Sequence, residues 1–247
     1  MRTFAIGTIC TLLLSASFTR AADDAAAIVD KAIKAHGADE HYGKYKAGQW
    51  KVKGIMNFMD MKMDYTADYT FQRPGEFRFD MEATFGGQKI AITAASNGKI
   101  AWEKGFGKVQ NMPKKKAEAF LHSVYCMHLS SLMPLKEKEY TLSAGGEENV
   151  DGKPALGVLV TRKGHPDISF FFDKESSLLV KFQTKTWDEF TNKDATQEAF
   201  FKDYKKKDGH LYFHKMIVKR DGKDLLEEEF SDQKSIEKLD AKLFAKP

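Results

Sequence analysis

Cysteine is scarce in this sequence: there are 2 among 247 residues, Cys10 and Cys126. We expect Cys10 to be removed with an N-terminal leader, so one thiol remains and an intramolecular disulfide is excluded. A strong charge of one sign is also missing. The formal net charge is +4, and it falls to +2 when Arg2 and Arg20 leave with the leader, which argues against a nucleic-acid-binding protein. After the leader, no apolar run is long enough to cross a membrane as a helix.

Recognisable catalytic motifs are lacking as well. The sequence has no nucleophile elbow, no phosphate-binding loop and no His-Glu-x-x-His helix. One cluster offers soft metal ligands, because His122 and Cys126 share one face of a predicted helix and His128 follows closely. On a continuous helix, however, His128 would point elsewhere, and a lone buried cysteine is common in protein cores. We therefore predict that the protein is not an enzyme and has no metal or cofactor.

The first residues have the composition of a signal peptide. A positive start at Arg2 precedes an apolar run over 4–14, and small residues precede a cleavage site after Ala21. We predict a signal peptide over residues 1–21 and a single exported domain over residues 22–247. That domain is long enough to bury one β-rich core.

The stretch from Trp50 to Met81 has the clearest structural pattern. Apolar and polar residues alternate over 50–58, over 61–71 and over 77–81, and Arg73-Pro74-Gly75 interrupts the pattern. A period of two is typical of strands with one wet and one apolar face, and short polar breaks indicate an antiparallel meander. The apolar face is rich in methionine and aromatic residues, which suit an adaptable surface for a flexible apolar ligand.

We predict that this apolar face lines a ligand cavity. For the methionines, a copper(I) site made of the thioethers of Met59, Met61 and Met63 is an alternative. Their shared strand face and aromatic neighbours favour an apolar lining instead. For the whole face, the alternative is an ordinary core surface that helices fill completely. The predicted lining consists of Trp50, Met56, Phe58, Met61, Met63, Tyr65, Tyr69, Phe71, Phe77 and Phe79.

The rest of the chain is predicted to add two amphipathic helices and more strands. Apolar residues recur at helical spacing over 25–36 and over 114–127. Short alternating runs separated by Asn-Gly and Asp-Gly turns make up most of the remainder, and residues 235–244 end the chain in a short helical turn. No strand–helix–strand rhythm is present. We therefore predict a mainly β fold of the α+β class, in which one large, curved antiparallel sheet carries the helices on its concave face.

Two short segments resemble periplasmic lipoprotein carriers of the LolA/LolB type. Gln72–Phe79 is similar to the RP-x-x-F segment of that family, and Ser96–Trp102 is similar to its DGK-x-x-W turn, with Asn97 in place of the aspartate. The resemblance implies an incomplete β-barrel closed by helices, whose apolar cavity takes acyl chains. It also implies a periplasmic location, and a role for Arg73 in positioning a helical lid and releasing cargo.

Three hypotheses about function follow. The first is an exported carrier that moves the acyl chains of lipids or lipoproteins across the cell envelope. The second is a non-catalytic envelope interaction module with the same fold, a filled interior and a partner-facing patch near Lys114–Lys116. The third is a metal-dependent enzyme that uses His122 and Cys126. We favour the carrier, acting as a monomer with acyl chains and membrane donor and acceptor proteins as partners, and without nucleic acid. The sequence leaves the identity of the cargo open.

Overall fold

The computed structural model describes residues 13–58 and 61–247, and strands make up most of it. The strands are β1 (Ala47–Phe58), β2 (Met61–Gln72), β3 (Glu76–Phe85), β4 (Gln88–Asn97), β5 (Ala101–Gly105), β6 (Lys108–Asn111), β7 (Thr141–Val150), β8 (Lys153–Thr161), β9 (Ile168–Asp173), β10 (Leu179–Asp188), β11 (Lys193–Lys202), β12 (Lys205–Lys207), β13 (His210–Tyr212), β14 (Lys215–Arg220) and β15 (Lys223–Ile236).

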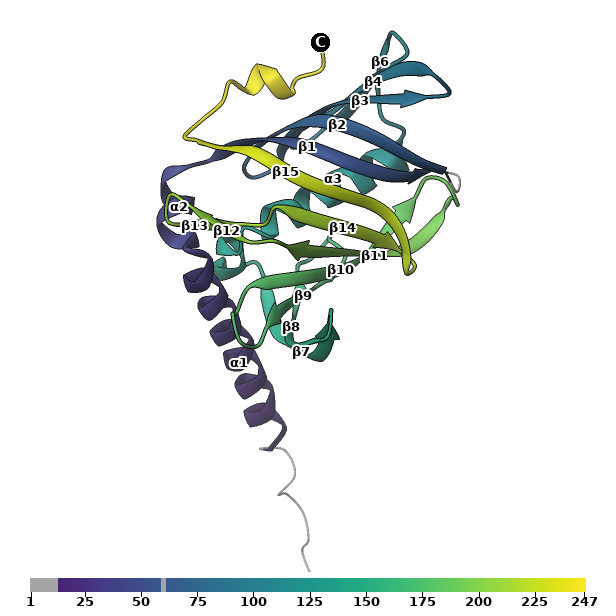
Figure 1. Cartoon of the computed structure of the whole chain (residues 1–247). Coiled ribbons are helices and arrows are strands. Elements are labelled where there is room, and N and C mark those ends of the chain that lie inside the picture. Colours follow the sequence, from purple (N-terminus) through teal and green to yellow (C-terminus); the bar gives the residue numbers. More distant parts are fainter. Residues whose placement is uncertain (1–12, 59–60) are drawn as a thin grey trace, which may run out of the picture.

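Of these strands, 13 form one antiparallel sheet in the order β6-β5-β4-β3-β2-β1-β15-β14-β11-β10-β9-β8-β7, and β12 and β13 form a separate hairpin. The large sheet curves around one face, and its end strands β6 and β7 do not pair with each other (Figure 1). The sheet is therefore an incomplete barrel, as the resemblance implies. The predicted fold class is confirmed.

The meander predicted over 50–81 is also confirmed, and its alternation separates two faces of the sheet. Trp50 on β1 pairs with Tyr69 on β2, and Tyr69 pairs with Phe79 on β3. Because directly paired residues point to the same face, these aromatic side chains gather on the concave side. On the opposite side of β3, Arg78 and Asp80 form an ion pair with 2.7 Å between Nε and Oδ2.

Strand β15 joins the two halves of the sheet. On one edge it pairs with β1, where Phe230 lies opposite Val52. On the other edge it pairs with β14, where Leu226 lies opposite Val218. The last strand of the chain thus lies between the first strand and the strands of the second half (Figure 1).

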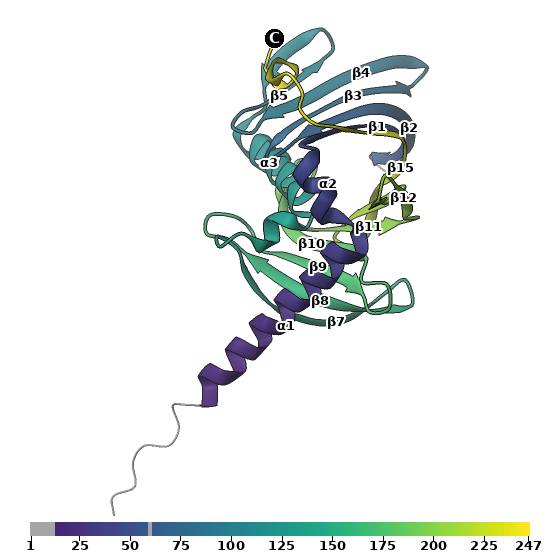
Figure 2. The ribbon, with the colours of Figure 1, turned by 90° about the vertical axis from the view of Figure 1, so that its left-hand side faces the viewer.

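Among the described residues, three α-helices and one 3-10 turn lie on the concave side of the sheet, and the N-terminal part of α1 projects beyond it (Figure 2). They are α1 (Leu13–His36), α2 (Ala38–Lys44), α3 (Lys114–Leu129) and the 3-10 turn η1 (Met133–Lys136). α1 packs on β7 and β8, whereas α3 reaches both β5 and β10. The helix predicted over 25–36 is part of α1, which begins within the predicted signal peptide, and residues 1–12 of that peptide lie outside the described residues. None of the helices in the described part of the chain has the length and apolarity needed to cross a membrane.

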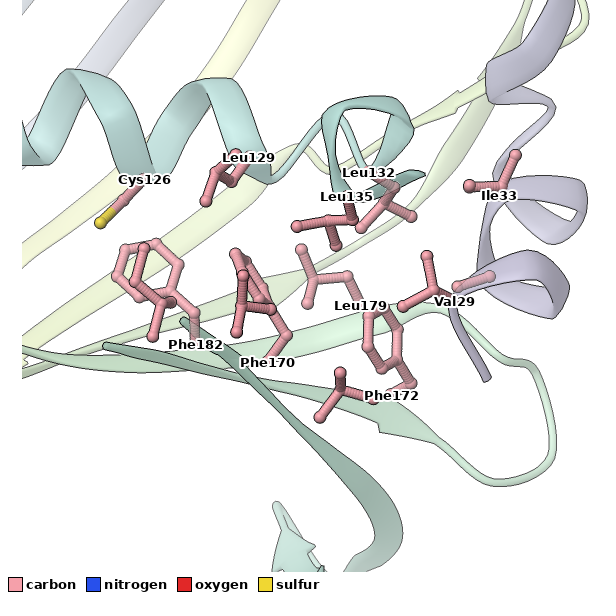
Figure 3. Close-up of a cluster of buried hydrophobic side chains, with 14 of the residues drawn as sticks. Val29, Ile33, Cys126, Leu129, Leu132, Leu135, Phe170, Phe172, Leu179 and Phe182 are labelled. Carbon is pink, nitrogen blue, oxygen red and sulfur yellow. The ribbon is translucent and has the colours of Figure 1, made fainter. Parts of the chain in front are cut away.

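The half of the sheet made by β7 to β11 has a filled core. Val29 and Ile33 of α1 and Leu129 of α3 point towards Phe170 and Leu179 of the sheet (Figure 3). None of these five side chains is more than 2% exposed. Full burial of one such side chain contributes about 1.5–3 kcal/mol, so this core anchors the helices firmly at that end.

The C-terminal segment packs on the other, convex face. The helical turn predicted over 235–244 is shorter than expected, because β15 continues to Ile236 and the 3-10 turn η2 covers only Ala241–Phe244. η2 contacts β3 and β4. Phe244 is fully buried there, and its carbonyl oxygen accepts a 2.9 Å hydrogen bond from the indole N–H of Trp102. Trp102, the last residue of the second carrier-like segment, therefore fixes the C-terminus to the outside of the sheet.

Candidate functional site

A cavity of about 480 Å³ lies between the concave face of the sheet and helices α2 and α3. Its wall is mostly apolar: the first half of the sheet contributes Trp50 and Phe79, the second half Phe182 and Phe201, and α3 contributes Phe120. The volume falls within the range of about 300–1,000 Å³ that is usual for small-molecule sites. The cavity is thus suited to an apolar ligand of moderate size.

Half of the residues predicted to line a cavity do line this one. They come from the neighbouring strands β1, β2 and β3, and their rings contact one another. The ring centroid of Tyr69 lies 5.4 Å from that of Phe77 and 6.0 Å from that of Phe79. Phe120 of α3 covers this group, 6.0 Å from Phe77. The predicted residues on the cavity wall are Trp50, Tyr69, Phe71, Phe77 and Phe79.

The other predicted lining residues lie away from the cavity. Tyr65 is buried in a neighbouring cluster, and Met56 and Met63 are half-buried at its edge. Met61, the first residue of β2, is 47% exposed. The side chain of Phe58 lies outside the described part of the structure. The cavity therefore occupies only the part of the meander that the helices cover.

Arg73 lies on the cavity wall and connects the sheet to α2. Its Nη2 donates hydrogen bonds to the carbonyl oxygens of Tyr42 and Tyr45, at 2.7 and 2.5 Å. The guanidinium also stacks on the ring of Tyr42, with 3.2 Å between Cζ and the ring centroid. A cation is favourable at a helix C-terminus, where the last carbonyl groups lack partners within the helix. The position predicted to hold the lid thus clamps the end of the short helix that covers the cavity.

A group of histidines forms the polar part of the wall beside α2. The rings of His41 and His210 stack with 4.4 Å between centroids, and His41 Nε2 lies 2.6 Å from the hydroxyl of Tyr212. Burial lowers the pKa of His36 and of His41 from 6.5 to about 4. Gly37, at φ 65°, lets α1 turn into α2, since a Cβ there would stand 2.3 Å from the carbonyl oxygen of Gly209. His41 thus holds α2 against the β12–β13 hairpin.

The cluster of possible metal ligands on α3 is packed against β10. His122 Nε2 lies 3.0 Å from the hydroxyl of Thr184 and 3.7 Å from Cys126 Sγ. Burial lowers the pKa of His122 to about 4 and raises the pKa of the Cys126 thiol. Within residues 13–58 and 61–247, no group of three or more His, Cys, Asp or Glu side chains is arranged to hold a metal ion. Met59, a predicted thioether ligand, lies outside those residues.

The basic start of α3, predicted as a partner-facing patch, is held to the sheet. Lys116 Nζ lies 2.9 Å from a carboxylate oxygen of Glu103 and 3.1 Å from one of Glu189. Lys115 Nζ lies 5.9 Å from the ring centroid of Trp187. These contacts give two of the three lysines a role in seating α3 on β5 and β10.

Sequence reasoning missed Glu228 as a site residue. Carboxylates are rarely buried in proteins, but Glu228 is fully buried and lies on the cavity wall. Its hydrogen-bond donors are Tyr65, with 2.5 Å between its hydroxyl and Oε1, and Tyr69, which donates to the same oxygen. The available signal was its position in β15, where it falls in register with the apolar residues Leu226 and Phe230.

No protein-family description matches this sequence, and no curated protein matches it. Solved structures with a similar fold do exist. One is a DUF1329 family protein from Desulfovibrio piger, which is 15% identical and has a TM-score of 0.59 over 90% of this chain and 97% of that chain. A LolA superfamily protein from Nitrosomonas europaea is 10% identical, with the same TM-score of 0.59 and the same coverage of 90% and 97%.

A third similar structure is a domain from Vibrio parahaemolyticus assigned to outer membrane lipoprotein sorting. It is 11% identical and has a TM-score of 0.53 over 87% of this chain and 97% of that chain. Identities this low establish the arrangement of the backbone and not the activity. Together, the three likenesses show that the chain has a LolA-like fold.

Proposed function

We propose that this protein is an exported, non-catalytic carrier that encloses an acyl chain of a lipid or lipoprotein during transfer across the cell envelope. The observation that carries the proposal is the aromatic-lined cavity of about 480 Å³ beneath α2 and α3. Each methylene group exposed to water costs about 0.8 kcal/mol, so an acyl chain is far more stable inside such a cavity than outside it. The fold shared with a domain assigned to lipoprotein sorting supports the same function.

In this proposal, residues 1–21 are a cleaved signal peptide and residues 22–247 are the carrier domain. The mature protein acts in the periplasm. α2 serves as the lid, and Arg73 holds the lid through the terminal carbonyls of that helix. Opening the lid requires these bonds to break. A membrane partner that competes for Arg73 or for α2 would therefore promote release.

A second function is favoured by the filled core between α1, α3 and strands β7 to β11. Much of the concave face is already occupied by the protein's own side chains, as expected for a module that binds a protein partner on its outside. The two functions differ in one respect: only the carrier takes an apolar molecule into its interior.

The test is the binding of a dansyl-labelled fatty acid, followed by its fluorescence. Wild-type protein is expected to bind the probe with a blue-shifted emission. Tyr69→Asp is expected to abolish binding, because it places a second carboxylate beside Glu228 on the cavity wall and an unpaired charge is costly to desolvate. Thr70→Asp is the matched control, since Thr70 is the next residue on β2 and pairs with Arg78 on the convex side.

Because Tyr69→Asp could lose binding by failing to fold, a second cavity variant without an added charge is also tested. Ser123→Phe adds a ring to the cavity wall from α3 without introducing a charge, and it should weaken binding by reducing the volume. Thermal unfolding of each variant is measured in parallel. If wild-type protein does not bind the probe, or if both cavity variants bind it as tightly as wild type, the carrier function is wrong and the interaction module is favoured.

A further inference from the structure

The carboxyl group of Glu228 is incompletely satisfied. Oε1 accepts hydrogen bonds from the hydroxyls of Tyr65 and Tyr69, whereas Oε2 is buried and has no hydrogen-bond partner among residues 13–58 and 61–247. Glu228 is 0% exposed and forms part of the cavity wall. A buried acceptor without a partner costs about 1–3 kcal/mol, and more when it is charged. A ligand in the cavity that satisfied Oε2 would recover that free energy.

Three adjacent strands are built around this carboxyl group. Gly54 on β1 lies opposite Tyr65 on β2 and, on its other side, opposite Glu228 on β15. Since Gly54 has no side chain, the ring of Tyr65 crosses over it to reach the carboxylate. A Cβ on Gly54 would stand only 2.3 Å from Cζ of Tyr65 and 2.6 Å from its hydroxyl oxygen. The hydrogen bond between Tyr65 and Glu228 therefore depends on the glycine that lies between them.

Among residues 13–58 and 61–247, no ion pair joins Glu228 to a cation. Its two hydrogen-bond donors are neutral phenols. Burial raises the pKa of Glu228 above 4.5, and the bonds from Tyr65 and Tyr69 act against that rise by stabilising the anion. Two of the cations on the cavity wall have other partners: Arg73 binds the end of α2, and Arg220 Nη1 lies 3.5 Å from a carboxylate oxygen of Asp188.

Because buried charges in proteins are normally paired, a cation that reached Oε2 from the cavity would stabilise the ionised form of Glu228. A carboxylate only accepts hydrogen bonds, and an ammonium group only donates them, so the two are complementary. The surroundings of Glu228 are otherwise apolar, with Leu226, Phe230 and Met216 on the same wall. They would contact the apolar body of a ligand whose amino group sits at the carboxylate.

We propose that Glu228 is the specificity-determining residue of the cavity and that its Oε2 binds the amino group of an amphiphile with an apolar chain. This inference rests on the proposed carrier function and narrows its ligand to amphiphiles that carry an amine. Tyr65 and Tyr69 are positioning residues, which hold the carboxylate so that one oxygen faces the ligand.

The experiment compares three amphiphiles with the same chain: dodecylamine, dodecanol and dodecanoate. Each competes with the dansyl-labelled fatty acid at neutral pH, below its micelle concentration. Wild-type protein should bind dodecylamine more tightly than dodecanol, and dodecanol at least as tightly as dodecanoate. In Glu228→Gln the preference for dodecylamine over dodecanoate should fall at least about 10-fold, as expected for loss of a buried charge pair.

Two further variants make the test decisive. Glu229→Gln removes the exposed neighbouring carboxylate on β15 and should leave the preference unchanged. If Glu228→Gln does not fold, Glu228→Leu is used, since an apolar side chain suits the surrounding wall and equally removes the acceptor.

The proposal is overturned if wild-type protein does not prefer dodecylamine over dodecanol, or if the preference survives both substitutions at Glu228. In those cases the dansyl-labelled fatty acid still binds, and the carrier function stands without amine recognition. If none of the amphiphiles and no dansyl-labelled fatty acid binds, the proposed carrier function itself fails. The two failures are therefore distinguishable.

Discussion

Replacing Arg73 by leucine is expected to loosen the lid without unfolding the sheet. The guanidinium holds α2 through its bonds to the carbonyl oxygens of Tyr42 and Tyr45 and through stacking on the Tyr42 ring. Leucine keeps much of the volume of the side chain but makes none of these three contacts. The free energy that keeps α2 closed should fall, whereas the pairing of β2 with β3 does not involve the side chain of Arg73.

The magnitude can be worked from these contacts. A hydrogen bond from a charged donor contributes about 1.5–3 kcal/mol, and a cation–π contact contributes about 0.5–1 kcal/mol at exposed sites. Arg73 is half-buried, so we take the lower values, and water regains part of the bonding to the freed carbonyls. A net loss of about 3 kcal/mol then remains, and at 1.4 kcal/mol per factor of ten the open lid becomes roughly 100-fold more populated.

Hydrogen exchange followed by mass spectrometry measures how often α2 opens. Peptides covering residues 38–45 should lose roughly 100-fold of their protection in Arg73→Leu, and those covering β3 should be unchanged. Arg73→Lys should lie between wild type and Arg73→Leu, because an ammonium group lacks the planar fork that binds two carbonyls and stacks. Arg78→Leu is the matched control, since Arg78 bonds to Asp80 and to the Leu243 carbonyl on the convex face.

The same change should speed release of a bound dansyl-labelled fatty acid to lipid vesicles. Equal protection of α2 in wild type and Arg73→Leu would refute the clamp. A uniform loss of protection in every peptide would also refute it, because Arg73 would then stabilise the whole fold and not the lid.

Three other predictions concern stability. First, the free energy of unfolding should fall as the pH drops from 6.5 to about 4, because the pKa of His36 and of His41 is lowered to about 4 in the folded chain. The buried His36 should contribute up to about 1.4 kcal/mol per pH unit, and the half-buried His41 should contribute less because solvent screens its charge. Urea unfolding across this range measures the slope, and a flat profile would contradict it. Second, Gly54→Ala should cost about 1–3 kcal/mol by displacing the Tyr65 ring, and tyrosine absorbance on alkaline titration should show a lowered pKa for that phenol. An unchanged titration would show that the ring keeps its place. Third, Phe244→Ala should cost about 3–5 kcal/mol on thermal unfolding with no change in affinity for the dansyl-labelled fatty acid, because Phe244 packs on the convex face. A changed affinity would place the C-terminus in the ligand site.

The sequence predicted what depends on local periodicity. The alternation around Tyr69 predicted both the strand and the face that lines the cavity, since successive side chains of a strand point to opposite sides. The same pattern placed Met61 and Met63 on that face but did not show how far the helices extend over it. Coverage depends on where α2 and α3 pack, which is a long-range property.

Glu228 illustrates the same limit for a single residue. Its partners come from β2, more than 150 positions earlier in the chain, and nothing next to Glu228 encodes them. Arg73 was found through a family resemblance, but its partners Tyr42 and Tyr45 became visible only with the structure. The position of β15 between β1 and β14 likewise has no local signal.

That position of β15 sets the order in which the protein can form. β1 lacks its second neighbouring strand, and β14 lacks one of its two, until the chain has been synthesised through Ile236. Strand pairs as distant in sequence as β1 and β15 form slowly, because a long loop must close before the pairing stabilises the fold. Unpaired strand edges also invite association with other chains. A newly synthesised molecule therefore passes through a stage with two unpaired strand edges, and it needs protection from aggregation and proteolysis until β15 has paired.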